Sequence, residues 1–411
     1  MMQLFQTFLG MGVIVLAAVL LSRSRATIPW RAVGMAFAGQ AALGALFLHV
    51  EWASRLLGAV TYLAKILEQS TVQGTAFVFG YIGGGTAPFE VLPGSSSFVF
   101  AFQILPVVLV VGAISALLVH WRVLGPVVAT GAWILRKTIG VTSPVGFAAV
   151  ANAFLGMIEA PLLIKPYLAR LHPNELFTVM AVGMSTVAGG TAIVISGIVA
   201  DDPQIFGNVI TATLMNVLGA IGIAMILFPS VPETGAGGQD VRIASPYRSS
   251  MEALVTGTTD GAKIFLSVVS LLIVFIALVA MIDAMLGLVH DELSLTKIFG
   301  VIFAPITWLL GIGAQEAVAA GEILGAKVAV NELVAYTALA ESGGELSAHT
   351  RFVLTFALCG FGNFGSVAIL IGGLSAMAPE RFKEIVGFGL WALVAAFLTN
   401  CLTAAIASAI G

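Results

Sequence analysis

The sequence predicts an all-α membrane protein that crosses the bilayer many times. Hydrophobic residues make up 59% of the 411 residues, whereas charged residues make up only 9%. An ordinary soluble domain is about 45–50% apolar and about 25% charged, so this chain has too few charges to cover a soluble surface. Eight apolar segments are each long enough to cross the roughly 30 Å hydrocarbon layer as a helix. They lie at about 4–21, 32–49, 102–120, 176–199, 206–228, 265–289, 352–377 and 386–410.

The first span, 4–21, predicts a transmembrane helix rather than a cleaved signal peptide. A signal peptide carries its positive charge before the apolar run, whereas Arg23 and Arg25 follow the run here. Because basic residues favour the cytoplasmic side of a membrane, we expect the N-terminus outside the cytoplasm. After the second span, the mixed segment 51–100 predicts an interfacial helix and a turn.

Two longer apolar regions, 124–168 and 297–345, are broken near the middle by polar residues. The first break reads NAFLGMIEAP over 152–161, and the second reads GAKVAVNE over 325–332. Irregular backbone at membrane depth persists only where protein or a water-filled cavity satisfies its polar groups. We therefore expect two re-entrant helical hairpins with a site at their tips. The alternative is two further pairs of ordinary helices, with the polar residues in exposed loops.

The two halves of the chain repeat one order of elements. Residues 190–198 read GTAIVISGI and residues 366–374 read SVAILIGGL, and each segment follows a hairpin with a glutamate at its tip. With the N-terminus outside, the first hairpin enters from the cytoplasm and the second from outside, so the repeats are inverted and the C-terminus lies outside. This topology also places most Lys and Arg residues in the cytoplasm. Inverted repeats with discontinuous helices are a common plan of secondary transporters.

Glu159 and Glu332, one at each predicted tip, are the most informative residues. A charged side chain at the centre of a bilayer costs about 2.5–3.5 kcal/mol on insertion scales, so one glutamate per repeat indicates a polar cavity. Carboxylate oxygens accept hydrogen bonds, which suits the hydroxyl and N–H donors of a polar neutral ligand. The alternative role is a structural cap at the positive end of a half-helix, and the two roles are compatible.

Glycines interrupt two of the spans. They are Gly183, Gly189 and Gly190 in the fourth span and Gly360, Gly362 and Gly365 in the seventh. Unwound helices free carbonyl oxygens, which hard cations prefer as ligands, so these breaks predict contacts with a cation or a substrate. Close packing of helices through small residues is the alternative explanation.

Other residues point to chemistry less directly. Phe361 is suited to stacking on a planar ligand, and Asp283 is suited to carrying a proton but falls near the end of a span. Cys359 and Cys401 lie in apolar stretches and predict packing. No nucleotide-binding, nucleophile or metal-ligand pattern occurs in the sequence, and the net charge of −3 excludes a basic nucleic-acid footprint. We therefore expect no catalytic residue, no cofactor and no nucleic-acid partner.

Taken together, these motifs resemble the concentrative nucleoside transporter family in its bacterial form. The resemblance rests on the two tip sequences, on CGFGNFGSVAI over 359–369, on GTAFVFG over 74–80 and on 98–106. It covers essentially the whole chain, with the motifs in the same order. The resemblance implies eight transmembrane helices and two re-entrant hairpins in inverted repeats, in a homotrimer of the elevator type.

The resemblance also assigns site residues by motif position. The nucleobase would face Gly156, Met157, Ile158 and Glu159, with Thr191 nearby. The ribose would be held by Glu332, Asn363 and Ser366, with Phe361 lining the pocket. Sodium would be held by the side chains of Asn152 and Thr186 and by the carbonyls of Leu155 and Val187.

Four of these positions bear on specificity and coupling. The family usually has Gln followed by Thr or Ser before the first tip glutamate, where this chain has the apolar Met157 and Ile158. A pocket that cannot bond a polar edge disfavours ligands that need that bond, so we expect a preference for purine nucleosides. Proton-coupled bacterial relatives can lose the asparagine at the cation position. Here Asn152 and Thr186 keep a sodium-type set, which favours sodium as the coupling ion.

The expected function is import of nucleosides by sodium symport across the plasma membrane, an inner membrane in bacteria. Lipid surrounds the protein, and both termini lie outside the cytoplasm. The first alternative is proton-coupled symport, with Glu159, Glu332 or Asp283 titrating. More distant alternatives are an intramembrane enzyme that uses the two glutamates and a gate-type protein that opens a pathway without coupling.

The expected organisation has four parts. Scaffold helices and the interfacial segment occupy 1–100, the first repeat 101–230, a cytoplasmic loop 231–262 and the second repeat 263–411. Each repeat consists of a span, a hairpin (124–168 or 297–345), a broken helix (176–199 or 352–377) and a final span.

Overall fold

The computed structural model describes residues 2–89, 98–229, 247–288, 290 and 293–411, and within these ranges the regular structure is entirely helical. The first half forms α1 (Met2–Leu20), α2 (Trp30–His49), α3 (Glu51–Phe79), α4 (Phe100–Gln103), α5 (Val107–His120), α6 (Leu124–Thr138), α7 (Ser143–Asn152), α8 (Glu159–Leu163), α9 (Lys165–Leu168), α10 (Pro173–Ser185), α11 (Gly189–Ile198) and α12 (Ile205–Leu227). The second half forms α13 (Ser250–Gly287), α14 (Leu295–Leu309), α15 (Ala317–Ala329), α16 (Glu332–Glu341), α17 (Ala348–Leu358), α18 (Phe364–Met377) and α19 (Phe382–Ile410).

Seven helical segments of the described chain are long and apolar enough to cross a membrane. They are Gln3–Leu20, Trp30–His49, Phe100–His120, Pro173–Ile198, Ile205–Leu227, Ser250–Gly287 and Pro379–Ile410. Each overlaps one predicted span. The remaining predicted span, 352–377, is divided into α17 and α18 by a non-helical stretch, and neither half-helix is long enough to cross alone.

The structure corrects the predicted cytoplasmic loop 231–262. Residues 231–246 lie outside the described residues, but α13 begins at Ser250, so the last part of the predicted loop is helical. The Ser249 hydroxyl accepts a hydrogen bond from the Glu252 backbone N–H at 3.1 Å, and the Glu252 carboxylate accepts one from the Arg248 N–H at 2.6 Å. These two bonds start the helix within its polar part, which a hydropathy argument does not detect.

Each predicted hairpin region begins with a helix that lies outside the hairpin itself. In 124–168, α6 precedes a hairpin of α7, α8 and α9, and in 297–345, α14 precedes a hairpin of α15 and α16. The extra break falls at Gly140 (φ +85°) in the first region and at Gly311 (φ +95°) in the second. Only glycine adopts these angles without strain, so the two hairpins are shorter than the predicted regions.

One order of elements occurs twice in the structure. The order is α5, α6, hairpin, broken helix α10–α11 and α12, followed by α13, α14, hairpin, broken helix α17–α18 and α19. The two opening helices, α5 and α13, pack along each other. The final helix α19 packs against α10 of the first repeat and against α17 and α18 of the second. The repeats are therefore interlocked around one common core.

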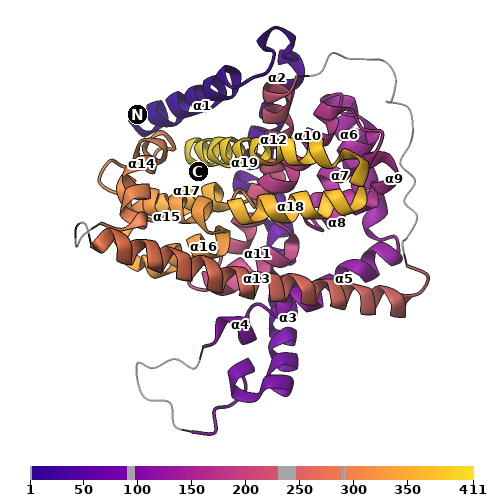
Figure 1. Ribbon diagram of the computed structural model, residues 1–411, viewed down its shortest axis with the longest axis vertical. Coiled ribbons are helices and arrows are strands. Elements are labelled where there is room, and N and C mark those ends of the chain that lie inside the picture. The colour runs from indigo at the N-terminus through magenta and orange to yellow at the C-terminus, as the bar shows by residue number, and fades with distance from the viewer. Residues whose placement is uncertain (1, 90–97, 230–246, 289, 291–292) are drawn as a thin grey trace.

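The core is formed by the broken helices together with α12 and α19. The apolar windows of α10–α11 and α12 are 83% and 78% buried. By contrast, no residue is buried in the most apolar window of α13, which lies along the outside of the molecule in Figure 1. An exposed apolar helix of this size indicates contact with lipid or with another chain.

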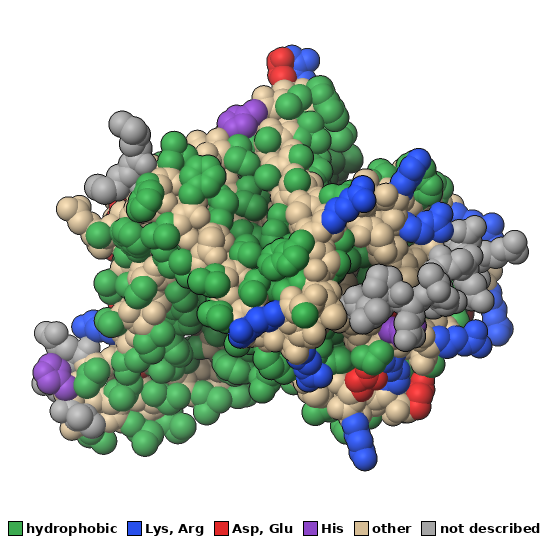
Figure 2. Space-filling model, turned by 90° about the horizontal axis from the view of Figure 1, so that it is seen from above, with side chains coloured by type: hydrophobic (Ala, Val, Ile, Leu, Met, Phe, Trp, Pro, Cys, Tyr) green, Lys and Arg blue, Asp and Glu red, His purple; other side chains and the backbone are tan. Residues whose placement is uncertain are grey.

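Both chain termini lie at the same end of the molecule. Gln3 near the start and Ser408 near the end each contact the His349 side chain, and Figure 1 shows N and C together on the left. Figure 2 keeps the same horizontal axis, and Lys and Arg gather toward its right side on a surface that is otherwise largely hydrophobic. On this face the Lys and Arg side chains therefore gather away from the end that holds the termini; we call this part of the surface the basic end.

Candidate substrate and cation site

The first hairpin tip, 153–158, contacts broken helices of both repeats. Met157 is 7% exposed and lies against Gly183 of α10. The Ile158 side chain lies so close to Gly373 of α18 that a Cβ at Gly373 would overlap it. Gly156 lies beside Ala188, in the break between α10 and α11. The tip predicted to face a nucleobase is thus held between the two repeats.

Glu159 follows this tip as the first residue of α8. Its side chain is half-buried, and one carboxylate oxygen lies close to Gly156. The carboxylate therefore turns back toward the tip rather than along its own helix.

Asn152 and Thr186 meet at the start of the same tip. Asn152 is the last residue of α7, and its amide nitrogen donates to the Val182 carbonyl at 3.2 Å and contacts the Thr186 hydroxyl. The Thr186 hydroxyl in turn donates to the Val182 carbonyl at 3.0 Å. Both side chains are almost fully buried.

The Asn152 Oδ1 atom is buried and has no hydrogen-bond partner within the described part of the chain. Leaving a buried acceptor unsatisfied costs about 1–3 kcal/mol. Two further predicted ligands, Leu155 and Val187, belong to the adjoining non-helical stretches at the hairpin tip and the α10–α11 break. Hydroxyl, amide and carbonyl oxygens beside an unwound helix are the ligands that suit a sodium ion. The residues present therefore fit this ion.

The second hairpin tip places Glu332 against the break of the second repeat. The Asn331 side chain accepts a hydrogen bond from the Val334 N–H at 3.0 Å and so starts α16. The Glu332 side chain is buried, and one of its oxygens accepts a hydrogen bond from the Asn363 amide at 3.0 Å. A carboxylate and an amide from separate elements are thus brought into one polar cluster.

Asn363 also starts α18. Its Oδ1 accepts a hydrogen bond from the Ser366 N–H at 2.8 Å, which is a helix N-cap. The Asn363 N–H donates to the carbonyl of Phe361 at 2.9 Å, which places the half-buried Phe361 directly before the cap. The residues predicted to hold the ribose therefore share one set of contacts.

The remaining predicted contact, Thr191, lies half-buried in the first turn of α11. The structure therefore groups the predicted residues into a ribose-type cluster around Asn363 and a cation-type cluster around Asn152. The first hairpin tip connects them, because it begins after Asn152 and ends against α18, the helix that Asn363 caps.

Two buried polar residues were missed as functional candidates from the sequence. Lys327 on α15 and Asn400 on α19 are fully buried and hydrogen-bonded to each other at 2.6 Å. The signal available for Lys327 was a lysine inside an apolar hairpin, because charges within membrane segments mark functional positions. Asn400 gave no local signal.

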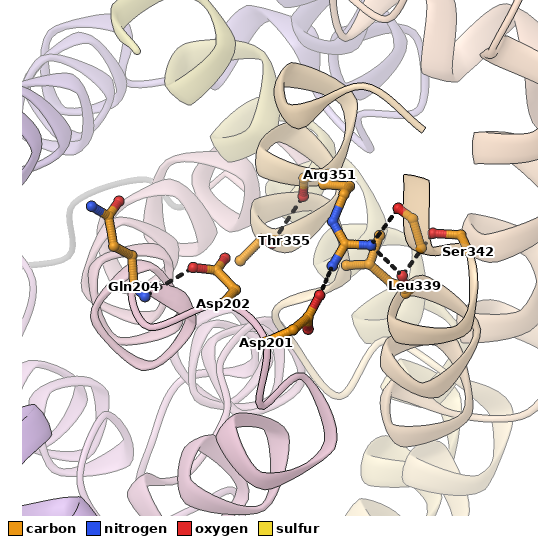
Figure 3. A network of polar contacts seen from close by, with 8 residues as sticks. Asp201, Asp202, Gln204, Leu339, Ser342, Arg351 and Thr355 are labelled. Atoms are coloured by element: carbon orange, nitrogen blue, oxygen red, sulfur yellow. Dashed lines mark hydrogen bonds and ion pairs between the residues drawn. The ribbon is translucent and has the colours of Figure 1, made fainter. Parts of the chain in front are cut away.

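The outer corner of the second hairpin is held by Arg351. Its guanidinium donates to the carbonyls of Leu339 and Gly343 at 3.0 and 3.2 Å, at the end of α16. It also pairs with Asp201, after α11, at 3.0 Å. Figure 3 shows Arg351 between Asp201 and Leu339. This contact joins the second hairpin to the first repeat.

The chain is similar to known proteins over nearly all of its length. The N-terminal and C-terminal profiles of the "Na+ dependent nucleoside transporter" family match residues 9–82 and 208–408, and a "nucleoside recognition" gate profile matches 101–202. The chain is 33% identical to a putative nucleoside permease NupX of Escherichia coli, over 99% of this chain and 98% of that one. It is also 33% identical to nucleoside permease NupC of Helicobacter pylori, over 97% and 96%.

A human relative, sodium/nucleoside cotransporter 1, is 30% identical over 97% of this chain but only 63% of its own length. A solved structure of CNTnw in an inward-facing, substrate-bound state matches all of this chain and all of that one, with 34% identity and a TM-score of 0.92. A variant of CNTnw in an outward-facing state matches with a TM-score of 0.90, over 100% and 98% of the two chains. With permeases similar over nearly their full length, the chain belongs to the concentrative nucleoside transporter family.

Proposed function

We propose that the protein imports nucleosides together with sodium ions. The observation that carries the sodium assignment is the buried Asn152 Oδ1, which has no hydrogen-bond partner among the residues described, in an amide that contacts the Thr186 hydroxyl at the end of α10. A sodium ion there would satisfy this oxygen and would meet the negative end of the α10 dipole. The sodium dependence named for the matching family supports the same ion.

The ribose is held by Glu332 and Asn363. A buried carboxylate accepts hydrogen bonds from sugar hydroxyls, and the Asn363 amide fixes its orientation at 3.0 Å. Ser366, in the first turn of α18, completes this half of the site, and Phe361 lines it. A nucleoside supplies the neighbouring hydroxyl donors that such a cluster needs.

The base lies against Met157 and Ile158, and this contact favours purines. Neither side chain can bond the polar edge of a pyrimidine, so selectivity comes from apolar contact with the larger purine ring. Glu159 and Gly156 remain as the polar groups on this side, with Thr191 across the break.

Sodium and nucleoside are coupled through the first hairpin tip. Sodium bound at Asn152 orders residues 153–158, and an ordered tip contacts the base. By linkage, each ligand raises the affinity for the other by the same factor. An inside-negative potential contributes about 2.3 kcal/mol per 100 mV to each imported cation, which corresponds to roughly fiftyfold accumulation of the nucleoside.

The transporter works as a homotrimer of elevator type in the plasma membrane, with the hairpins re-entrant and both termini outside the cytoplasm. The exposed apolar face of α13 supports an assembly, and the basic end that lies away from the termini supports this orientation (Figures 1 and 2). In a bacterium this membrane is the inner one.

The test is accumulation of radiolabelled adenosine and uridine in proteoliposomes. An inward sodium gradient, an inward proton gradient and a membrane potential alone are imposed in separate experiments. We expect accumulation above equilibrium with sodium only, and faster uptake of adenosine than of uridine. Accumulation driven by protons would contradict the sodium assignment, and a uridine preference would contradict the purine assignment. Uptake that never exceeds equilibrium would indicate an uncoupled pathway.

A further inference from the structure

Lys327 is a fully buried lysine with two defined acceptors. It lies on α15, in the second hairpin, and its side chain has no exposed surface. Its ammonium donates to the Ala357 carbonyl at 2.8 Å and to Asn400 Oδ1 at 2.6 Å. None of these contacts is explained by nucleoside or sodium binding alone.

Asn400 extends the contact of Lys327 to the other repeat. Its Oδ1 accepts from Lys327, and its amide nitrogen donates to the Ser185 carbonyl at 2.8 Å. Ser185 is the last residue of α10, and Ala357 is one residue before the end of α17. One ammonium therefore reaches the carbonyl ends of both broken helices, directly in the second repeat and through Asn400 in the first.

The ends of broken helices are where a cation is most effective. The last four carbonyls of a helix have no helical partner, and the C-terminus carries about half a negative charge from the aligned dipoles. Inside a membrane protein, water does not screen this charge. A cation at this point therefore fixes the position of the carbonyl end and of the non-helical segment that follows it.

The two repeats differ in the groups that lie at the carbonyl end of the broken helix. Ser185 and Leu358, the two helix ends, are 173 residues apart, and so are Glu159 and Glu332. The first helix end is followed by Thr186, whose hydroxyl contacts the Asn152 amide, and Asn152 Oδ1 has no hydrogen-bond partner in the described part of the chain. The second is followed by Cys359, a soft ligand that does not suit sodium. In that repeat the carbonyl end receives a lysine ammonium.

We propose that Lys327 is a covalently attached cation that takes the place of a second sodium ion. It couples the cation-type cluster around Asn152 to the ribose-type cluster around Asn363. Asn400 bonds the Ser185 carbonyl, next to Thr186, and Lys327 bonds both Asn400 and the Ala357 carbonyl. When sodium fixes the position of Thr186, these bonds therefore also fix the position of Ala357. The segment after Ala357 leads within six residues to Asn363, which holds Glu332. Lys327 is a positioning residue and touches neither ligand. The inference rests on the proposed sodium symport.

The test is the sodium dependence of nucleoside binding, measured at equilibrium with purified protein in nanodiscs. Labelled adenosine is titrated with and without saturating sodium, with choline as the replacement cation. The ratio of the two dissociation constants is the coupling factor, which is typically about 5–150. In Lys327→Met, which removes the charge but keeps much of the volume, we expect this ratio to fall to about twofold or less. Lys327→Arg retains a cation and should keep most of the coupling.

A purely structural role would weaken adenosine binding with and without sodium and leave their ratio unchanged. That result in folded Lys327→Met would overturn the inference. Lys263→Met, which removes an exposed lysine of α13 that pairs with Asp260, is the matched control and should behave as wild type. If wild type shows no coupling, the sodium assignment fails and the coupling role of Lys327 fails with it, whereas an unchanged ratio in Lys327→Met beside a coupled wild type overturns only the role of Lys327.

Asn400→Ala gives a second test if Lys327→Met does not fold. This variant keeps the bond from Lys327 to Ala357 but removes the link to Ser185. We expect its coupling factor to fall at least threefold, while adenosine binding in saturating sodium changes less. Unchanged coupling in Asn400→Ala would overturn the proposed connection between the cation-type and ribose-type clusters.

Discussion

The buried Asn152 amide directs both of its hydrogens at protein oxygens, whereas its own oxygen has no hydrogen-bond partner among the described residues. The Val182 carbonyl and the Thr186 hydroxyl take the amide hydrogens. A buried group satisfied on one side only is costly, and the proposed sodium site at the end of α10 rests on this group. At the scale of single residues, the proposed cation site is therefore identified by a buried acceptor, Asn152 Oδ1, to which its described neighbours donate no hydrogen bond.

Removing the Thr186 oxygen should weaken sodium activation. Thr186→Val keeps the shape of the side chain but removes one proposed ligand and one of the two acceptors of the Asn152 amide, the other being the Val182 carbonyl. A hydrogen bond to a charged group contributes about 1.5–3 kcal/mol, so we expect the sodium concentration for half-maximal uptake to rise at least about tenfold. Thr186→Ser keeps the hydroxyl and serves as the control. Equal sodium activation in both variants would contradict the assignment.

Restoring hydrogen-bonding groups at the first tip should change base selectivity. In the double variant Met157→Gln with Ile158→Thr, two new groups can bond a pyrimidine edge, each contributing about 1 kcal/mol. We expect the ratio of kcat/KM for adenosine to that for uridine to fall roughly thirtyfold. Ile158→Val keeps the tip apolar and should leave the ratio near its wild-type value. No shift in the double variant would show that these positions do not read the base.

At the scale of elements, half-helices are held by side chains from other elements rather than by their own length. Arg351 satisfies two carbonyls at the end of α16 and links them to Asp201. On the first hairpin, Arg381, which precedes α19, donates to the carbonyls of Leu168 and Leu171 at 2.9 and 2.7 Å. Each hairpin corner is thus fastened by an arginine from the second repeat.

The carbonyl bonds of Arg351, rather than its ion pair, should stabilise the corner. Arg351→Met removes the guanidinium donor from the Gly343 carbonyl and leaves the Leu339 carbonyl with the Ser342 hydroxyl as its side-chain donor, and we expect a loss of about 1–3 kcal/mol. Asp201 is 64% exposed, and an exposed ion pair contributes about 1 kcal/mol or less, so Asp201→Asn should have a smaller effect. The midpoints of thermal unfolding in detergent test this order. A larger loss in Asp201→Asn would contradict it.

At the scale of the whole molecule, the longest apolar helix lies outside the core. Leu266 and Ile273 of α13 are each about two-thirds exposed. If α13 forms the assembly interface, its apolar side chains must fit those of a neighbouring chain, and added bulk will separate the chains. The exposed side chains of α1 would instead face lipid.

Bulky substitutions on α13 should therefore separate the proposed trimer. We expect wild-type protein in mild detergent to have three times the chain mass of 42.5 kDa, measured by light scattering. Leu266→Trp with Ile273→Trp should give the single-chain mass. Leu16→Trp, on the exposed side of α1, should leave the assembly intact. Trimers in the α13 variant, or separation in both variants, would refute this interface.

Hydropathy predicts the spans and the two polar tips because membrane helices are long and apolar, and an internal glutamate is rare within them. The same signal does not separate α6 from α7 or α14 from α15, since their composition is continuous across Gly140 and Gly311. It also misses the polar start of α13. The contact of Lys327 with Asn400 joins residues 73 positions apart, and such a pairing depends on how helices cross. Asn152 and Thr186 are predicted as cation ligands from the family resemblance alone. Their contact with each other and with the Val182 carbonyl depends on the fold and is not readable from the sequence.

The shared location of the two termini makes single-chain oligomers accessible. Residues near both ends contact His349. In a tandem fusion, the C-terminus of one copy and the N-terminus of the following copy would therefore lie at the same end of the molecule. Copies can therefore be fused in tandem with a flexible linker and without an added transmembrane segment. Such a concatemer would carry a substitution in one, two or three protomers at a defined ratio, and would show whether each protomer completes its cycle independently.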